Sequence, residues 1–208
     1  MAASLNEYSD IELWLLTPNN EVLDYRSTSE WRYRFKAGDT KQQADNGILD
    51  LISNGESEYC EFKKYIDLSD TKGSKAWEID KTVCAFSNHK GGKLLIGVSD
   101  EAEVVGIEEA KKHYLCGAEE AAASYVAAIT KRLRESLIKN QCFTCELVTL
   151  YGKLVVVVEV EETGELNYIN QKKQAFIRRG ASSRLMTPDE IQSFSIQSEN
   201  MFHISNRA

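Results

Sequence analysis

Three acidic side chains stand at the ends of two short segments that have the composition of buried β-strands. Glu56 precedes and Glu61 lies within the first, GESEYCEFKK, and Asp100 ends the second, LLIGVSD. Successive side chains of a strand point to opposite faces, so Glu61 is expected to face a groove or solvent with Lys63, opposite the core residue Phe62. If the two strands are neighbours in one sheet, the three carboxylates converge on one place.

Carboxylates gathered in this way suggest metal chemistry. Hard divalent cations such as Mg²⁺ or Mn²⁺ prefer all-oxygen ligands. A metal held by Glu56, Glu61 and Asp100 could activate water and stabilise the transition state of phosphoryl transfer. The other interpretation is that these charges only solvate the edge of a sheet, and the spacing by itself favours it. Glu58 falls on the Phe62 face and is assigned no role.

Basic residues near the end of the chain are candidates for phosphate contact. Arg178 and Arg179 end an apolar segment, small hydroxyl residues follow, and Arg184 precedes a predicted helix start. The guanidinium fork matches phosphate geometry, so we expect these three arginines, together with Lys63, to bind nucleic acid. The alternative is that one of the arginines pairs with a carboxylate at a strand end of the same sheet. Both interpretations remain open at this point.

Two other kinds of site have weaker support. The segment NHKGGK lies between a predicted helix and a strand, which reverses the order that a phosphate-binding P-loop needs, and it lacks the Ser or Thr. Cys142 and Cys145 form a C-x-x-C pair, but a zinc site needs two more ligands, for which His113 and Cys116 are the nearby candidates. Free cysteines more often simply pack in a core.

Composition sets limits on the class of protein. The 208 residues carry a net charge of −7, which argues against a protein that coats nucleic acid nonspecifically but allows a local basic groove. No apolar run is long enough to span a bilayer, and no signal peptide is recognisable. Five cysteines, an odd number, suit reduced thiols. We therefore expect a cytoplasmic protein without membrane contact.

Hydrophobic periodicity predicts an α+β fold, with a single mixed β-sheet and helices packed on it. A strand-rich N-terminal appendage is expected over residues 1–45, the main domain over 46–195 and a flexible tail over 196–208. Within the main domain, strands are expected over 58–64, 94–98, 104–107, 145–150, 153–161 and 174–179, and helices over 74–88, 118–139 and from 187 onward, where Thr187 and Glu190 are expected to form a capping box.

Four motifs together resemble the Schlafen-type AlbA domain. They are ESEYCEFKK, AFSNHKGGKLLIGVSD, VVGI and FIRRGASSRLMTPDEI, and they extend over roughly Glu56 to Phe194. The resemblance implies an AlbA-like fold and association with nucleic acid. In the vertebrate Schlafen proteins the corresponding domain cleaves transfer and ribosomal RNA with three acidic residues, whose pattern is similar to that of Glu56, Glu61 and Asp100.

The leading functional expectation is a Mg²⁺- or Mn²⁺-dependent endoribonuclease acting on structured RNA, with tRNA as the first guess. The alternative is a non-catalytic regulator that binds nucleic acid or nucleotide on the same scaffold, and a third possibility is an oligomerising or partner-binding unit. The vertebrate nuclease joins two related lobes, and this sequence holds one. A homodimer could supply the second lobe. The helicase or winged-helix parts common in the family are not seen, so we expect a stand-alone module or one that acts through partners.

Overall fold

The computed structural model describes residues 12–16, 22–27, 47–68, 75–112, 117–170 and 172–205. The chain forms two compact units, Met1–Ile48 and Leu49–Ala208. In the first, β1 (Glu12–Leu16) and β2 (Val22–Ser27) pair as an antiparallel hairpin, as the two apolar runs predict. No helix in the described ranges is long and apolar enough to cross a membrane.

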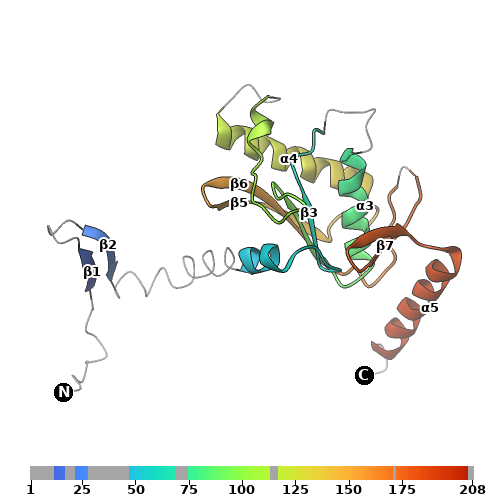
Figure 1. Cartoon of the computed structure of the whole chain (residues 1–208). Helices are drawn as coiled ribbons and strands as arrows, with labels where there is room; N and C mark the ends of the chain where they lie inside the picture. Colours follow the sequence, from blue (N-terminus) through green and yellow to red (C-terminus); the bar gives the residue numbers. More distant parts are fainter. Residues whose placement is uncertain are drawn as a thin grey trace, which may run out of the picture. The chain divides into compact units, whose positions relative to one another are not determined.

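The second unit is built on a four-stranded mixed sheet (Figure 1). Its strand order is β3 (Cys60–Lys63), β4 (Gly92–Ile96), β6 (Lys153–Val160) and β5 (Phe143–Leu150). β3 and β4 are parallel, and the other pairs are antiparallel. The two strands that carry the predicted carboxylate site are therefore neighbours, with Glu61 opposite Leu94 in the register.

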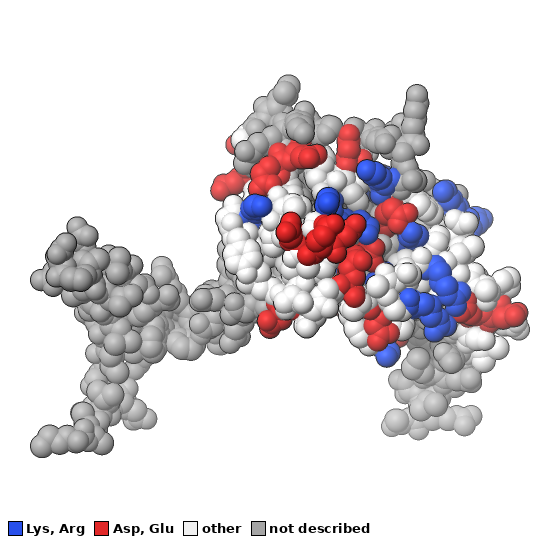
Figure 2. Space-filling model, viewed as in Figure 1, with Lys and Arg blue, Asp and Glu red and all other residues white. Residues whose placement is uncertain are grey.

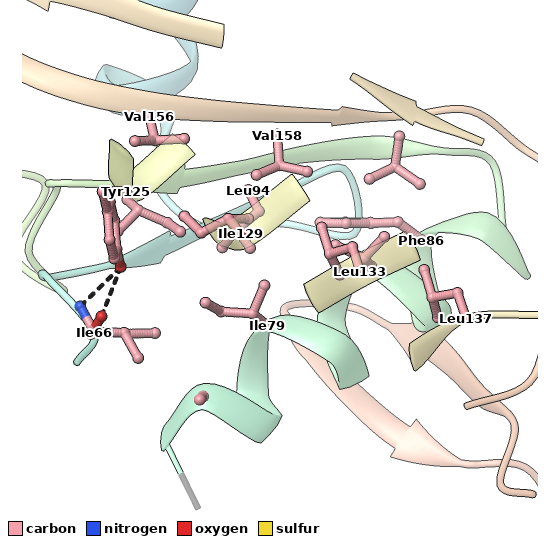
Figure 3. Close-up of a cluster of buried hydrophobic side chains, with 14 of the residues drawn as sticks. Ile66, Ile79, Phe86, Leu94, Tyr125, Ile129, Leu133, Leu137, Val156 and Val158 are labelled. Atoms are coloured by element: carbon pink, nitrogen blue, oxygen red, sulfur yellow. Dashed lines mark hydrogen bonds between the residues drawn. The ribbon is translucent and has the colours of Figure 1, made fainter. Parts of the chain in front are cut away.

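Helices cover one face of this sheet. They are α3 (Lys75–Ser87), which connects β3 to β4, and α4 (Ala118–Ser136), which follows η1 (Glu108–Lys112) and precedes β5. A short helix over 47–54 precedes β3, and its buried residues Ile48 and Ile52 lie outside the core cluster between these helices and the sheet. Figure 3 shows Leu94, Val156 and Val158 of the sheet facing Ile129 and Leu133 of α4. Each of these side chains is fully buried, and such burial is the main source of the fold's stability.

Tyr125 of α4 fixes the chain just after β3. Its hydroxyl donates to the carbonyl of Ile66 at 2.8 Å and accepts from the amide of Ile66 at 3.3 Å (Figure 3). Both polar groups of a buried backbone segment are thereby satisfied, which an irregular segment otherwise achieves with difficulty. This bond positions the end of β3, where Lys63 lies.

A second, two-stranded sheet lies at the C-terminal side of the chain. β7 (Phe176–Arg179) pairs antiparallel with β8 (Ser182–Leu185) across a turn in which Gly180 has a φ of +57°. β7 matches the predicted strand over 174–179, whereas β8 was not predicted. The predicted capping box is present, because the Thr187 amide donates to Glu190 Oε2 at 2.9 Å and the Glu190 amide donates to Thr187 Oγ1 at 3.3 Å.

The last helix, α5 (Pro188–Ser205), begins with proline at its first position. Its helical backbone continues past residue 196, where the sequence predicts a tail. The element order and the mixed sheet confirm the predicted α+β class. The strands β7 and β8 add a small separate sheet to it.

Candidate nucleic-acid interface

The buried pair of Arg178 and Glu61 joins the small sheet to β3. Side chains alternate along β7, so Arg178 points inward with Phe176, and its side chain has no exposed area. Nη1 donates to Glu61 Oε2 at 2.7 Å and to Ser183 Oγ at 3.0 Å, and Nη2 donates to the carbonyl of Ser57 at 2.5 Å. The guanidinium carbon also lies 4.7 Å from the ring centroid of Phe86.

Such enclosure decides what Arg178 can do. A guanidinium without exposed area does not meet a phosphate at the surface, so its role is to hold Glu61 and the start of β3 in place. The sequence left open that one arginine pairs with a carboxylate of the same sheet; Arg178 does pair with a carboxylate, but Glu61 belongs to the main sheet and Arg178 to the small one. Its Nε is buried and has no hydrogen-bond partner in the part of the chain that the structure describes.

Glu61 is bound by cations at both oxygens. Its Oε1 accepts from Lys63 Nζ at 2.6 Å, while Oε2 accepts from Arg178. Lys63 Nζ also donates to the carbonyl of Phe62 at 2.9 Å. Glu61 is only 9% exposed, so it lies inside the protein and not on the open groove face that the alternation predicts. The reason is its register with Leu94, which places it on the helix-covered face.

Glu56 has a backbone partner. β3 is an edge strand of the main sheet, and Glu56 Oε1 accepts the amide of Phe62 at 2.8 Å. The carboxylate therefore satisfies a donor that no neighbouring strand of the sheet uses.

Asp100 lies beside lysines at the end of β4. A cavity of about 280 Å³, here called the lysine pocket, is lined by Lys63, Lys64, Tyr65, Ile66, Lys75, Glu78 and Asp100. It lies where β3 ends and α3 begins. Of the predicted metal ligands only Asp100 reaches this pocket, together with the predicted phosphate contact Lys63.

The arrangement does not fit a preformed metal site. Within the described ranges, no group of three or more His, Cys, Asp or Glu side chains could hold a metal ion. Both oxygens of Glu61 are already bound by Lys63 and Arg178, and one oxygen of Glu56 holds an amide. A cation at this place would have to displace two charged partners.

The C-x-x-C pair gives no sign of a zinc site either. Cys142 is buried and its thiol donates to the carbonyl of Lys139 at 3.1 Å. Burial raises the pKa of both the Cys142 and Cys145 thiols, which disfavours the thiolate that zinc binds. The other two candidate ligands, His113 and Cys116, lie outside the described residues.

A surface arginine cluster is formed by Arg179, Arg184 and Glu190. Arg179 Nη2 donates to Glu190 Oε1 at 3.1 Å, Arg184 Nη1 donates to Oε2 at 2.9 Å, and Arg184 Nη2 also bonds to Oε1. Bonds from Arg184, and then from the amide of Thr187, lower the pKa of Glu190 to about 2. The two arginine side chains stay 58% and 41% exposed. Figure 2 shows basic and acidic atoms side by side over β7.

Two guanidinium groups share one carboxylate here, so the surface arginine cluster keeps a net positive charge. Arg179 and Arg184 are thus brought together at the surface. Glu190 was recognised in the sequence as part of a helix cap but not as the partner of these arginines. The sequence feature that could have indicated this pair is the spacing of six residues between Arg184 and Glu190, across the predicted start of the helix.

Comparison with known proteins places the chain in a family. The family described as Schlafen, AlbA_2 matches residues 56–187, more than half of the chain, which confirms the resemblance drawn from the motifs. No protein of curated function matches the sequence.

Two solved structures are similar to this chain at low sequence identity, and the first of them shares its fold. The DIP2311 protein from Corynebacterium diphtheriae is 14% identical with a TM-score of 0.51, over 75% of this chain and 28% of that chain. The N-terminal domain of a RecG-related protein from Nitrosomonas europaea is 22% identical with a TM-score of 0.35, over 57% of this chain and 72% of that one. The chain thus spans less than a third of the Corynebacterium protein.

Proposed function

Because this chain belongs to the Schlafen AlbA_2 family, which associates it with nucleic-acid-related function, we propose that it binds structured RNA through the phosphate backbone. The observation that carries the proposal is the surface arginine cluster. Arg179 and Arg184 stand on a tight hairpin with about half of each side chain exposed; both bond to Glu190, and Asp189 lines the same hollow as Arg179. Arginine forks suit the bidentate recognition of phosphate.

The hairpin is supported from beneath. Arg178 anchors β7 to β3 through the buried pair, so the neighbouring Arg179 projects from a fixed backbone. Lys63 of the lysine pocket contacts the other oxygen of Glu61, and Lys64 and Lys75 line the same pocket. The contacts of Glu61 thus connect the buried Arg178 with Lys63 at the end of β3. A phosphate chain would meet exposed positive charge at Arg179 and Arg184 of the hairpin.

RNA of defined shape is the substrate class that we propose, with tRNA as the first probe. Structured RNA is recognised largely by shape and backbone contact, which needs positioned cations and no base-reading motif. The chain as a whole carries a charge of −7, so binding depends on this local surface and should be strongly sensitive to salt.

The test is the salt dependence of tRNA binding by fluorescence anisotropy. The Arg179→Ala/Arg184→Ala variant should bind more weakly, and the slope of log K against log salt should fall by about 0.7–0.9 per lost phosphate contact. The matched control is Lys131→Ala/Arg134→Ala on α4, which removes two exposed cations elsewhere and should bind like the wild type. Absence of binding, or an equal loss in both double variants, would contradict the proposal.

A second candidate is a Mg²⁺- or Mn²⁺-dependent endoribonuclease. The observation in its favour is that Asp100 and Lys63 line one cavity and that Lys63 lies 2.6 Å from Glu61. Against it stands the poor fit to a metal, because Glu61 would first have to leave Arg178 and Lys63. Incubation of tRNA with Mn²⁺ should then give cleavage that Asp100→Asn abolishes and Glu146→Gln, an exposed carboxylate on β5, leaves intact. Uncut tRNA, or equal cutting by both variants, rejects this candidate.

We also propose that two copies pair about a twofold axis when RNA is bound, because the vertebrate Schlafen nuclease that the sequence resembles clamps RNA between two related lobes. Light scattering of the complex should give twice the protein mass per RNA. A one-to-one complex at saturating RNA and protein would exclude the dimer.

A further inference from the structure

A second surface group lies where α3 ends and β3 begins. Here called the tyrosine platform, it consists of Tyr59, His89 and Lys90. The Tyr59 and His89 rings stack with centroids 6.3 Å apart at an interplanar angle of 28°. Lys90 Nζ lies 3.4 Å from the Tyr59 hydroxyl and 6.0 Å from the ring centroid.

The backbone beneath the platform is held by hydrogen bonds. The Tyr59 carbonyl accepts from the amide of Lys93 at 2.8 Å, which ties it to β4. The amides of His89 and Gly91 both donate to the carbonyl of Phe86 at 3.0 Å. Gly91 has a φ of +74°, and a Cβ at this position would lie 2.5 Å from the carbonyl oxygen of Val160. The turn therefore requires glycine and presents His89 and Lys90 in one geometry.

The platform remains open to a ligand. Tyr59 is 40% exposed, although its neighbours Cys60 and Phe62 are fully buried. An exposed aromatic ring beside a cation is the arrangement that binds single-stranded nucleic acid, since bases stack on the ring and the cation meets the backbone. The Glu58 carboxylate accepts from His89 Nε2 at 3.0 Å, and this bond, then a bond from Tyr59 and the charge of Lys90, lower the pKa of Glu58, so one carboxylate lies beside the platform.

The platform is also joined to the RNA surface already described. Arg178 donates to the carbonyl of Ser57, and Ser57 Oγ accepts from the amide of Tyr59 at 3.1 Å. The same buried arginine thus supports the hairpin of Arg179 and Arg184 on one side and the start of the platform on the other. The Tyr59 ring and the surface arginine cluster therefore belong to the same unit of the protein, and one RNA molecule could contact both.

We propose that the tyrosine platform binds an unpaired base of the RNA, with the base on the Tyr59 ring and the adjoining phosphate at Lys90. The inference rests on the proposed RNA binding and adds a preference to it. The protein should favour structured RNA that carries a single-stranded extension over a blunt duplex of the same sequence.

Two RNA probes test the platform, a blunt hairpin and the same hairpin with a short single-stranded extension. Wild-type protein should bind the extended probe tighter by about fivefold or more, the effect of stacking one base. Tyr59→Ala should lose this increment, whereas Tyr59→Phe, which retains the ring, should keep it. The matched control is Tyr151→Ala, because Tyr151 is a 79% exposed tyrosine on the turn between β5 and β6.

The outcomes separate this inference from the proposed function. If both probes bind with equal affinity and the binding is sensitive to salt, the inference about the tyrosine platform is wrong and the proposed RNA binding is supported. If Tyr59→Ala still binds the extended probe tighter than the blunt one, the base does not stack on Tyr59 and the inference is also overturned. If Tyr59→Ala weakens both probes equally, the residue supports the fold and is not a stacking site. Failure to bind either probe removes the function together with the inference.

Discussion

The buried pair and the surface arginine cluster use the same chemistry on the same hairpin and differ in their surroundings. Arg178 and Glu61 meet inside the protein, where the arginine side chain has no exposed area. Arg179 and Arg184 meet Glu190 at the surface, with the two arginines about half exposed. The alternation of side chains along β7 separates the two adjacent arginines, one inward and one outward.

The difference in burial separates the arginine that stabilises the fold from the arginines that are exposed to a ligand. Removing one partner of a buried ion pair leaves an unpaired charge in the interior, whereas an exposed pair contributes little because water and salt screen it. The interior arginine therefore determines whether β3 and β7 stay together, and the exterior arginines are the ones that can exchange a carboxylate for a phosphate. A shift of one residue in the register of β7 would exchange the two roles.

The largest effect should come from breaking the buried pair. Arg178→Met removes the cation from Glu61 and the hydrogen bonds to Ser57 and Ser183, so we expect the free energy of unfolding to fall by about 3–5 kcal/mol. Urea denaturation followed by circular dichroism measures it. Arg179→Met on the same strand is the control, and an equal loss in both variants would contradict the contrast between interior and surface.

Removing both charges tests where that cost originates. In Arg178→Met/Glu61→Leu neither member of the buried pair is left charged, and Lys63, which loses Glu61, is 25% exposed, so we expect the double variant to recover much of the lost stability. The same denaturation series gives the coupling between the two sites. If the double variant is as unstable as the sum of its single variants, packing and not charge accounts for the loss.

A smaller effect is expected from releasing the surface arginines. Glu190→Gln removes the carboxylate that Arg179 and Arg184 share, so tRNA should bind several-fold tighter at low salt. Anisotropy measures the change. Glu119→Gln in the first turn of α4 removes a matched exposed charge and should leave the affinity as it is. Tighter binding in both variants would assign the effect to net charge alone.

The smallest expected effect is the contribution of Glu190 to the pH dependence of stability. The pKa of Glu190 is about 2 in the folded protein, below the value of about 4.3 of a free glutamate. A lowered pKa stabilises the fold above the unfolded value, and this stabilisation is lost as the pH falls toward 2. The difference in urea midpoint between wild type and Glu190→Gln should therefore be constant above pH 5 and shrink below pH 4. If the difference in urea midpoint does not change with pH, titration of Glu190 does not contribute to the acid sensitivity of the fold.

Much of the fold could be predicted because its strands and helices are strongly patterned. The valine run of β6 and the Tyr151-Gly152 turn predict the β5–β6 hairpin, and the stripe of Ile129 and Leu133 predicts α4. β8 was missed because its sequence, SSRL, has one apolar residue and depends on pairing with β7. Propensity alone does not identify such a strand.

The candidate site was less accessible to prediction. The sequence left open a pair between one of the arginines and a carboxylate, and it did not identify the two residues, since Glu61 lies 117 residues from Arg178. The signal was present in the alternation, because Arg178 shares a strand face with the buried Phe176. Whether carboxylates on two strands converge depends on side-chain partners in the folded protein, and those partners are not encoded in spacing.

The bond between Glu56 and the Phe62 amide has a consequence for how copies of this protein meet. An edge strand with free amides is a template on which another chain can extend the sheet, and fibril growth begins in this way. At β3 a carboxylate occupies one of these donors and brings a negative charge to the rim. Sheet extension by a second chain is thereby disfavoured on this side, even at high concentration.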